Sequence, residues 1–360
     1  MRSNFTTNSL QELLSQIEKL SPKNREEMKE QVAKVLGESL ISILDTHNTQ
    51  SVIIAFLNKS KKYVVKVELR GETGSVDKEI NWYLKVGASF SNCPKYLGSV
   101  VGKNITALIL SYIDNSLTID EMVFQSKIDT NQTWKLIREA VKFLNSLFEN
   151  KPKRKISLIE ADALFIEKYE SRFIEAQSCE YLQKLLSLKS LYINGRTFPN
   201  FDFYISKIVK DQKLREFLTP NVYGIIHGDL HCGNILVKNN RVYMVDPNGN
   251  LSMPIEYDYG KILHSIHGGY GSIINGNYKL TELGEDQFGF SIQIPEIYTV
   301  MSSKFIRTIP PDLFVRSFYA EAMHFATMLP HHASNEAETK ALFIRGVMVF
   351  KELFDLLDSN

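Results

Sequence analysis

Residues 227–237 constrain this chain more than any other segment, because a polar loop runs directly into an apolar strand. The loop reads His-Gly-Asp-Leu-His-Cys-Gly-Asn, and Ile-Leu-Val follows it. Apolar residues 223–226 precede the loop and predict a strand there, and a second apolar run, 241–245, comes after the turn Lys-Asn-Asn. Two apolar runs joined by an Asn-rich turn predict a β-hairpin. The fold must therefore accommodate a small, rigid ribbon at this point.

Three polar side chains belong to the loop end of this ribbon. Asp229 lies in the loop that enters the hairpin, Asn234 begins its first strand, and Asp246 follows its second. Mg²⁺ prefers oxygen ligands and takes one or two protein carboxylates together with phosphate oxygens. Asn234 and Asp246 suit such an ion, which leaves Asp229 to accept the proton of an attacking hydroxyl. The pattern predicts a phosphoryl-transfer site.

This segment resembles the catalytic loop of the aminoglycoside phosphotransferase and choline kinase-like family, a branch of the protein-kinase-like fold. In that family the loop commonly reads His-Gly-Asp-Leu-His-x-Gly-Asn, as it does here. The resemblance implies that Asp229 is the catalytic base and that Asn234 and Asp246 bind Mg²⁺. It also implies that His227 braces the loop.

Two positions depart from the family pattern. Cys232 stands where Pro is frequent, and residues 246–249 read Asp-Pro-Asn-Gly where Asp-Phe/Trp-Gly/Glu is more usual. Neither departure removes a functional atom. Asp258, near the start of the next expected helix, matches a family Asp that hydrogen-bonds to the catalytic loop. An N-terminal helix cap is the simpler explanation for the same residue.

A kinase-like fold also needs a lysine on a strand and an acidic partner on the next helix. Residues 61–68 are rich in β-branched side chains, which predicts a strand, and Lys66 lies there between valines. Residues 75–86 have apolar side chains at helical spacing, with Glu79 in the first turns. The resemblance implies that Glu79 holds Lys66 on the phosphates of ATP. Taken singly, each could be an ordinary surface charge.

The adenine contact and the phosphate-covering loop are the least specific expectations. Residues 106–110 predict a strand, and the backbone groups of Ser111 and Ile113 resemble the adenine contacts at its end. Residues 44–51 occupy the place of the phosphate-covering loop but contain no glycine. Their hydroxyl and backbone donors could cap phosphates, although a plain hairpin turn is the simpler alternative.

The resemblance implies an α+β, bilobal protein-kinase-like fold. We expect a helical extension over 1–36, a nucleotide-binding lobe with a small antiparallel sheet and one key helix over 37–113, and a mostly helical catalytic and substrate-binding lobe over 114–360. The apolar spacing predicts these helices: 8–36, divided at Ser21-Pro22, then 118–126, 130–149, 158–190, 309–329 and 335–357.

Composition excludes some classes of protein. The formal net charge of +1 gives no reason to invoke nucleic acid or a membrane surface, and no run reaches the roughly 20 apolar residues of a spanning helix. The three cysteines are scattered, which argues against a disulfide framework and favours a reducing cytoplasm.

The acceptor of the phosphoryl group is the open question. Segments 321–325 and 328–332 resemble a branch of the family associated with surface-polysaccharide and sugar metabolism, so a sugar hydroxyl is the first choice. An aminoglycoside, a choline-like amino alcohol and a protein remain alternatives. A nucleotide-binding regulatory pseudokinase is a further one, and a zinc hydrolase could use His264 and His267. In a kinase, these two histidines would line the acceptor side.

Overall fold

The computed structural model describes residues 7–44, 51–58, 60–71, 74–87 and 90–359. Its internal contacts divide the chain into two compact units. Unit 1 comprises Met1–Leu117 and Asn234–Leu251, and unit 2 comprises Thr118–Gly233 and Ser252–Asn360. The chain therefore passes from unit 2 to unit 1 between Gly233 and Asn234, at the end of the polar loop.

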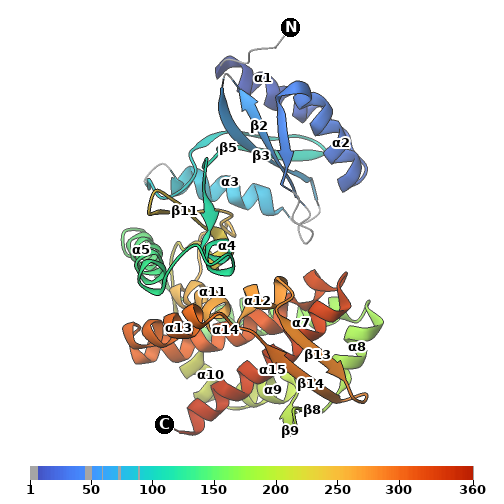
Figure 1. Ribbon diagram of the computed structural model, residues 1–360, viewed down its shortest axis with the longest axis vertical. Helices are drawn as coiled ribbons and strands as arrows, with labels where there is room; N and C mark the ends of the chain where they lie inside the picture. Colours follow the sequence, from blue (N-terminus) through green and yellow to red (C-terminus); the bar gives the residue numbers. More distant parts are fainter. Residues whose placement is uncertain (1–6, 45–50, 59, 72–73, 88–89, 360) are drawn as a thin grey trace. The chain divides into compact units, whose positions relative to one another are not determined.

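An antiparallel sheet of five strands forms the centre of unit 1, in the order β1-β2-β3-β5-β4 (Figure 1). Its strands are β1 (Leu40–Ile43), β2 (Val52–Asn58), β3 (Lys61–Leu69), β4 (Tyr96–Val101) and β5 (Ile105–Ser111). The structure confirms the two strands predicted over 61–68 and 106–110. β3 is the middle strand, so both of its edges are paired.

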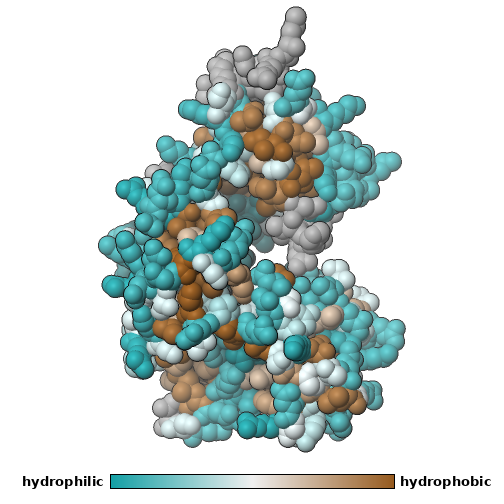
Figure 2. Space-filling view, in the orientation of Figure 1, coloured by the Kyte–Doolittle hydropathy of each residue, from teal (hydrophilic) through white to brown (hydrophobic). Residues whose placement is uncertain are grey.

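Two helices, α1 (Thr7–Glu18) and α2 (Arg25–Leu36), cover one face of this sheet. Ile17 and Met28 from these helices share a hydrophobic cluster with Val65 and Val67 of β3. The predicted division at Ser21-Pro22 is confirmed, and a short 3₁₀ turn, η1 (Gly37–Ser39), leads into β1. The outer side of α2 is hydrophilic (Figure 2). The N-terminal extension thus supplies the apolar layer on this face of the sheet.

The helix α3 (Ser75–Lys85) packs on the opposite face. The Glu68 carboxylate accepts hydrogen bonds from Val76 N (3.0 Å) and Ser75 Oγ (3.1 Å) at the first turn of α3. Alternate residues of a strand point to opposite faces. Lys66, which has the same parity as Glu68, therefore lies on the α3 side, away from the cluster that contains Val65 and Val67.

The predicted hairpin is confirmed as β11 (Ile235–Lys238) and β12 (Arg241–Met244), which pair antiparallel. Asn239 and Asn240 connect the strands with φ values of 50° and 58°. Positive φ at both central residues is the requirement of a type I′ turn, and Asn tolerates it better than most residues. The turn residues therefore fix the register of the ribbon.

The strand expected before the polar loop is shorter than predicted. β10 (Val222–Tyr223) pairs with β7 (Arg154–Lys155), and Gly224 adds a single bridge to Met253. Ile225 and Ile226, which follow, belong to no strand. Another two-residue strand, β6 (Leu117–Thr118), lies at the junction between the two units in the sequence.

Helices dominate unit 2, as predicted. They are α4 (Ile119–Phe124), α5 (Thr130–Glu149), α6 (Leu158–Asp162), α7 (Ile166–Ala176), α8 (Glu180–Ser187), α9 (Phe201–Lys210), α10 (Gln212–Leu218), the 3₁₀ turn η3 (Cys232–Asn234) at its edge, α11 (Ile255–Ile266), α12 (Tyr270–Ile274), α13 (Glu296–Thr308), α14 (Pro311–His332) and α15 (Glu336–Asp358). α11 packs on α14, and α14 packs on α15. A Cβ added to Gly260 of α11 would lie 2.8 Å from Ala320 Cβ of α14, so the glycine lets these two helices approach closely.

Three predictions for unit 2 were wrong in detail. The single helix expected over 158–190 is broken into α6, α7 and α8, and neither α7 nor α8 begins with a side-chain cap hydrogen bond. α14 continues through Pro330 and ends two residues later. A four-stranded sheet in the order β13-β14-β8-β9 was missed; its strands are β8 (Ser190–Ile193), β9 (Arg196–Pro199), β13 (Tyr278–Glu282) and β14 (Gln287–Ile292).

The missed sheet had a local signal. Asn194 and Gly195 join β8 to β9 with φ values of 50° and 81°, and an Asn-Gly pair between short β runs predicts a hairpin. The α+β class, with antiparallel strands in unit 1 and helices prevailing in unit 2, is confirmed. Within the described ranges, no helix combines the length and apolar character needed to cross a bilayer.

Candidate active site

Lys66 of β3 is held between two carboxylates in unit 1. Its Nζ lies 2.8 Å from Glu79 Oε2 of α3 and also contacts Asp246 Oδ1 after β12. The side chains of Lys66 and Glu79 are only 9% and 3% exposed. Burial opposes the charge of Lys66, but Asp246 and Glu79 outweigh it and raise the Lys66 pKa. The lysine is therefore a fixed, permanently charged group.

The two influences on the Glu79 carboxylate oppose each other. Burial raises its pKa to about 7, although Lys66 acts in the opposite direction. A buried ion pair is held in place only where the geometry and further partners are good. The structure thus brings together the two residues that the sequence paired thirteen positions apart.

Asp246 has an unusual backbone conformation. Its φ of 59° lies in the left-handed region, which non-glycine residues rarely adopt and which is commonly found at functional sites. Val245 N donates to Asn234 O (3.0 Å), so Asn234 and Asp246 begin and end the same ribbon. The Asp246 side chain remains 37% exposed while Lys66 holds one of its oxygens. An amide and a carboxylate at this end of the hairpin are oxygen donors that fit Mg²⁺.

Gly249 makes the closest backbone approach near this group. It has a φ of +80°, and an added Cβ would lie 2.3 Å from the carbonyl carbon of Lys78 and 2.5 Å from Glu79 N. The segment that begins at Asp246 is therefore pressed against the turn of α3 that carries Glu79. The sequence reading did not assign a role to Gly249, although a Pro-Asn-Gly run is typical of a tight turn.

The expected adenine contacts lie at the end of β5. Ser111 N donates to Lys95 O (2.9 Å), and Ser111 Oγ accepts from Lys95 N (2.8 Å). Ile113 O accepts from Ser116 Oγ (2.7 Å), which closes a turn. These contacts shape the segment that follows β5. The phosphate-capping role considered for residues 45–50 lies outside the described part of the chain.

In unit 2, Asp258 organises the polar loop. Its two carboxylate oxygens accept hydrogen bonds from His227 N (2.8 Å), Gly228 N (2.8 and 3.0 Å) and Leu230 N (3.2 Å). Asp258 is fully buried in the first turn of α11. Burial raises its pKa to about 7 against these three backbone donors. One side chain thus fixes the backbone on both sides of Asp229.

Asp229 itself contacts a lysine that the sequence reading did not single out. Lys261 Nζ of α11 lies 2.8 Å from Asp229 Oδ1, and His231 Nε2 lies 3.9 Å from Asp229 Oδ2. Asp229 N also donates weakly to His227 Nδ1 (3.4 Å). Burial would raise the pKa of Asp229, but Lys261 and His231 outweigh it and hold the pKa well below its usual range. Asp258 and Lys261 are three residues apart on one helix, a spacing that could have indicated this lysine.

The two histidines considered for zinc do not share an environment. His264 is 1% exposed and stacks on Tyr270, with ring centroids 4.6 Å apart. His267 is the residue after the last turn of α11, and its Nδ1 lies 3.0 Å from Glu321 Oε1. The spacing suggested one helical face, but the helix ends between them. Over the described ranges, no group of three His, Cys, Asp or Glu residues could hold a metal ion.

The profile of the phosphotransferase enzyme family (APH) matches residues 54–279, which span both Lys66 and Asp258. The chain belongs to this family. The prediction of a small-molecule kinase is thereby confirmed at the level of the family. No curated protein sequence matches the chain.

Solved structures of similar fold agree with this assignment. A thermostable mutant of aminoglycoside phosphotransferase APH(4)-Ia is 11% identical with a TM-score of 0.53, covering 87% of this chain and 95% of that one. A structure of a thermostable mutant of this enzyme in ternary complex with ADP and hygromycin B is 11% identical, with a TM-score of 0.54. The match covers 89% of this chain and 97% of that one. A putative fructosamine-3-kinase from Haemophilus somnus 129PT is 10% identical, with a TM-score of 0.51. The match covers 88% of this chain and 96% of that one. These likenesses confirm the protein-kinase-like fold.

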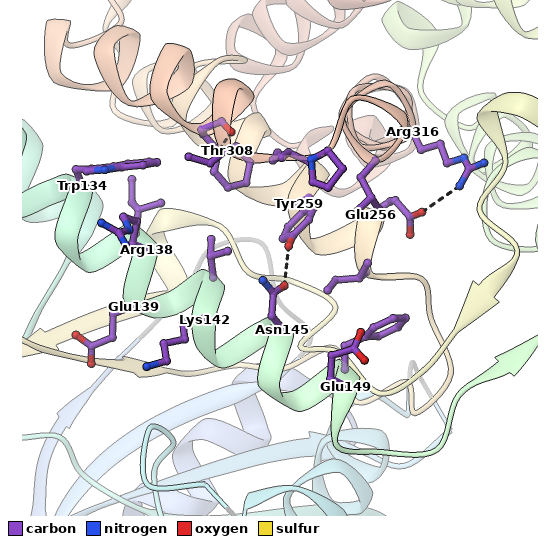
Figure 3. A pocket seen from close by; sticks show the side chains of 18 of the residues that line it. Trp134, Arg138, Glu139, Lys142, Asn145, Glu149, Glu256, Tyr259, Thr308 and Arg316 are labelled. Carbon is purple, nitrogen blue, oxygen red and sulfur yellow. Dashed lines mark hydrogen bonds and ion pairs between the residues drawn. The ribbon is translucent and has the colours of Figure 1, made fainter.

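This phosphotransferase also has a cavity of 1230 Å³ inside unit 2, which its predicted site residues do not line (Figure 3). Trp134 and Asn145 of α5 and Glu256 and Tyr259 of α11 line it, and Tyr259 Oη donates to Asn145 Oδ1 (2.6 Å). Glu256 lies 3.8 Å from Arg316. α11 therefore presents one side to this cavity and another, with Asp258, to the polar loop.

Proposed function

We propose that the chain transfers the γ-phosphoryl group of ATP to a hydroxyl of a sugar or sugar derivative, in a reaction that requires Mg²⁺. The observation that carries this proposal is the buried Lys66, held between Glu79 and Asp246. Catalysis of phosphoryl transfer depends chiefly on positioning and on electrostatic stabilisation of the phosphate oxygens. A fixed cation of this kind supplies both. The complex of a relative with ADP supports ATP as the donor.

In this proposal Lys66 contacts the phosphates of the nucleotide, and Glu79 orients it. Asn234 and Asp246 would hold Mg²⁺, which neutralises charge on the phosphate oxygens when it is bound. The strained backbone of Asp246 fixes the direction of its carboxylate. Backbone groups of Ser111 and of Ile113 would contact adenine.

Asp229 is proposed as the group that receives the hydroxyl proton. The acceptor oxygen bonds to the γ-phosphorus, the bond from that phosphorus to the leaving oxygen of ADP breaks, and the proton passes to Asp229. Because Lys261 keeps Asp229 ionised, its first task is to orient the hydroxyl by accepting its hydrogen bond. His227 and Asp258 hold the loop that carries it.

The acceptor class rests on weaker support. The likeness of the tail segments to a sugar-related branch favours a sugar, and one structural relative is named a putative fructosamine-3-kinase. Another relative binds hygromycin B, so an aminoglycoside is the main competitor. A regulatory nucleotide-binding role is disfavoured because Lys66, Asp229, Asn234 and Asp246 are all retained. We propose the cytoplasm as the setting, since all three cysteines are free thiols.

The test is ADP formation by the purified full chain with Mg²⁺ and ATP, against a panel of sugars, aminoglycosides, amino alcohols and nucleosides. We expect turnover with a sugar and a loss of about 10²- to 10⁴-fold in Asp229→Asn, the range of general acid–base assistance. The affinity of Asp229→Asn for ATP should stay near that of the wild type, because Lys66 is untouched. Undiminished turnover in this variant refutes the role of Asp229. Tight ATP binding without turnover on any acceptor favours the regulatory alternative.

A further inference from the structure

Four histidines and a tyrosine form a continuous wall beside Asp229 in unit 2. We call His231, His264, His324, His332 and Tyr270 the histidine wall. His231 lies next to Asp229, and its ring centroid is 5.7 Å from that of Tyr270. Tyr270 stacks on His264 and meets His332 at 6.0 Å, while His264 lies 6.1 Å from His324. The wall draws on the polar loop, α11, α12 and α14.

The positive charge beside the wall comes from Lys261. It lies on α11 one turn before His264, so the two side chains project from the same side of the helix. Burial lowers the pKa of His264 and of His324 well below the usual histidine range, and Lys261 adds to the effect. Both rings are therefore neutral near pH 7. The Lys261 side chain is 19% exposed, and that of Asp229 is 31% exposed.

The other carboxylates near the wall have partners of their own. Asp120 accepts from Tyr298 Oη, Glu338 lies 2.7 Å from His332 Nδ1, and Asp258 accepts from the backbone of the polar loop. A polycationic acceptor would require a concentrated acidic face. This side of unit 2 offers Lys261 and the neutral rings of His264 and His324 instead.

His264 adds a second, independent observation. Its Nδ1 and Nε2 are both buried and make no hydrogen bond with any described residue. A buried polar group in this state is costly, and a ligand hydroxyl that reaches it would relieve the cost. Neutral imidazole can donate from one nitrogen and accept at the other, as sugar hydroxyls require.

The Lys261–Asp229 ion pair creates a chemical difficulty that an anionic acceptor would remove. A carboxylate paired with an ammonium group at 2.8 Å is a poor proton acceptor. A ligand anion that binds Lys261 would draw the ammonium group away from Asp229 and restore its basicity. The proton of the attacking hydroxyl could then pass to Asp229 as the phosphoryl group is transferred.

We propose that Lys261 is a specificity-determining residue that binds an anionic group of the acceptor, a carboxylate or phosphate ester on the sugar, beside the hydroxyl that meets Asp229. This inference rests on the proposed function. Tyr270 provides the neutral face against which the sugar ring lies, and the buried ring of His264 stacks on Tyr270. The preferred acceptor is thus a sugar acid or a sugar phosphate, in contrast to a polyamine sugar.

The experiment measures kcat/KM for matched acceptors that differ in one charged group. The pairs are glucose with glucuronate, galactose with galacturonate and mannose with mannose 6-phosphate, and glucosamine and kanamycin represent cations. The full chain is compared with Lys261→Met, which keeps most of the length of the side chain and removes its charge. Lys168→Met is the matched control, because Lys168 is also partly buried with one side-chain partner, Tyr257 Oη at 2.8 Å.

We expect the anionic member of at least one pair to be preferred by about 10- to 100-fold, the range of a charge-assisted hydrogen bond. The preference should persist in Lys168→Met and fall to near unity in Lys261→Met. The acid limb of the pH profile should also move to higher pH in Lys261→Met, because loss of the Lys261 charge lets the pKa of Asp229 rise. His227, His231 and Tyr270 are the groups that then still face Asp229. Lys261→Arg keeps the charge and should retain the preference, which secures the test if the Met variant folds poorly.

The possible failures are distinguishable. Turnover that favours a neutral or cationic acceptor, or an anionic preference that survives in Lys261→Met, overturns this inference and leaves the kinase function standing. An equal loss of preference in Lys168→Met also overturns it. Absence of turnover with every acceptor overturns the proposed function, and this inference falls with it.

Discussion

Substitution of Gly249 by alanine tests whether the segment after Asp246 positions α3. An added Cβ would lie 2.3 Å from the Lys78 carbonyl carbon and 2.5 Å from Glu79 N, both of which are backbone atoms. Carbon atoms in contact are normally about 3.5–4.0 Å apart. The loop or the helix must therefore shift by about 1 Å, and Glu79 moves with it.

Two contributions add to the expected loss of stability in Gly249→Ala. The φ of +80° costs an L-residue about 1–2 kcal/mol, and forced overpacking costs about 1–3 kcal/mol. The sum is about 2–5 kcal/mol. Gly71→Ala isolates the first contribution, because Gly71 has a φ of +92° and no atom of the described residues lies within 4 Å of its added Cβ.

Urea unfolding and ADP formation give the two measurements. We expect Gly71→Ala to lose about 1–2 kcal/mol and to keep its turnover. Gly249→Ala should lose more stability and about 100-fold in turnover, since a misplacement of about 1 Å at an active site has an effect of that order. Its affinity for ATP should weaken, because Glu79 no longer holds Lys66. Equal behaviour of the two variants would refute the steric argument.

Three further substitutions test contacts inside unit 2. Asp258→Asn places an NH₂ group against the backbone donors of the polar loop. We expect the free energy of unfolding to fall by about 1–3 kcal/mol and most turnover to be lost, while ATP affinity is retained through Lys66. Unchanged turnover contradicts the bracing role of Asp258. Gly260→Ala should lower the free energy of unfolding by about 1–3 kcal/mol, because the added methyl overpacks against Ala320. Ala320→Gly in the same chain should recover part of this stability, whereas additive losses would exclude the contact. Burial raises the pKa of Glu256 to about 7, above its unfolded value of about 4.5, so its contribution to stability is complete below pH 4.5 and is lost as the pH rises through 7. Glu256→Gln should therefore gain up to about 3 kcal/mol relative to the wild type between pH 4.5 and 8 in urea unfolding, and a difference independent of pH would contradict this.

Local patterns in the sequence were sufficient wherever a short segment determines its own conformation. The hairpin 235–244 follows from two apolar runs and a turn whose asparagines tolerate positive φ. The strand with Lys66 and the helix with Glu79 follow from β-branched residues and helical spacing. Asn194-Gly195 carried an equally local signal for a hairpin, although the sheet around it was not predicted.

Boundaries inside the helical region were harder to predict, since they depend on which caps are stabilised by neighbours. The stretch 158–190 has helical spacing throughout, yet Ser157 caps a first short helix, and the chain turns twice before α8. Pro330 would normally end a helix at the residue before it, but α14 continues through Pro330 to His332. Packing overrides local preference in both cases.

The sequence by itself determined the family, the fold class and the chemical inventory of the site, because the spacing of the polar loop and the hairpin is a local property of the chain. Only the tertiary structure decided which of these groups meet. It paired Asp229 with Lys261, separated His264 from His267 where α11 ends, and set Gly249 against the backbone of α3. The two contacts join residues far apart in the sequence, and all three outcomes depend on how each helix is rotated and where it ends. Rotation and termination are fixed by close packing among many side chains, which no short pattern records.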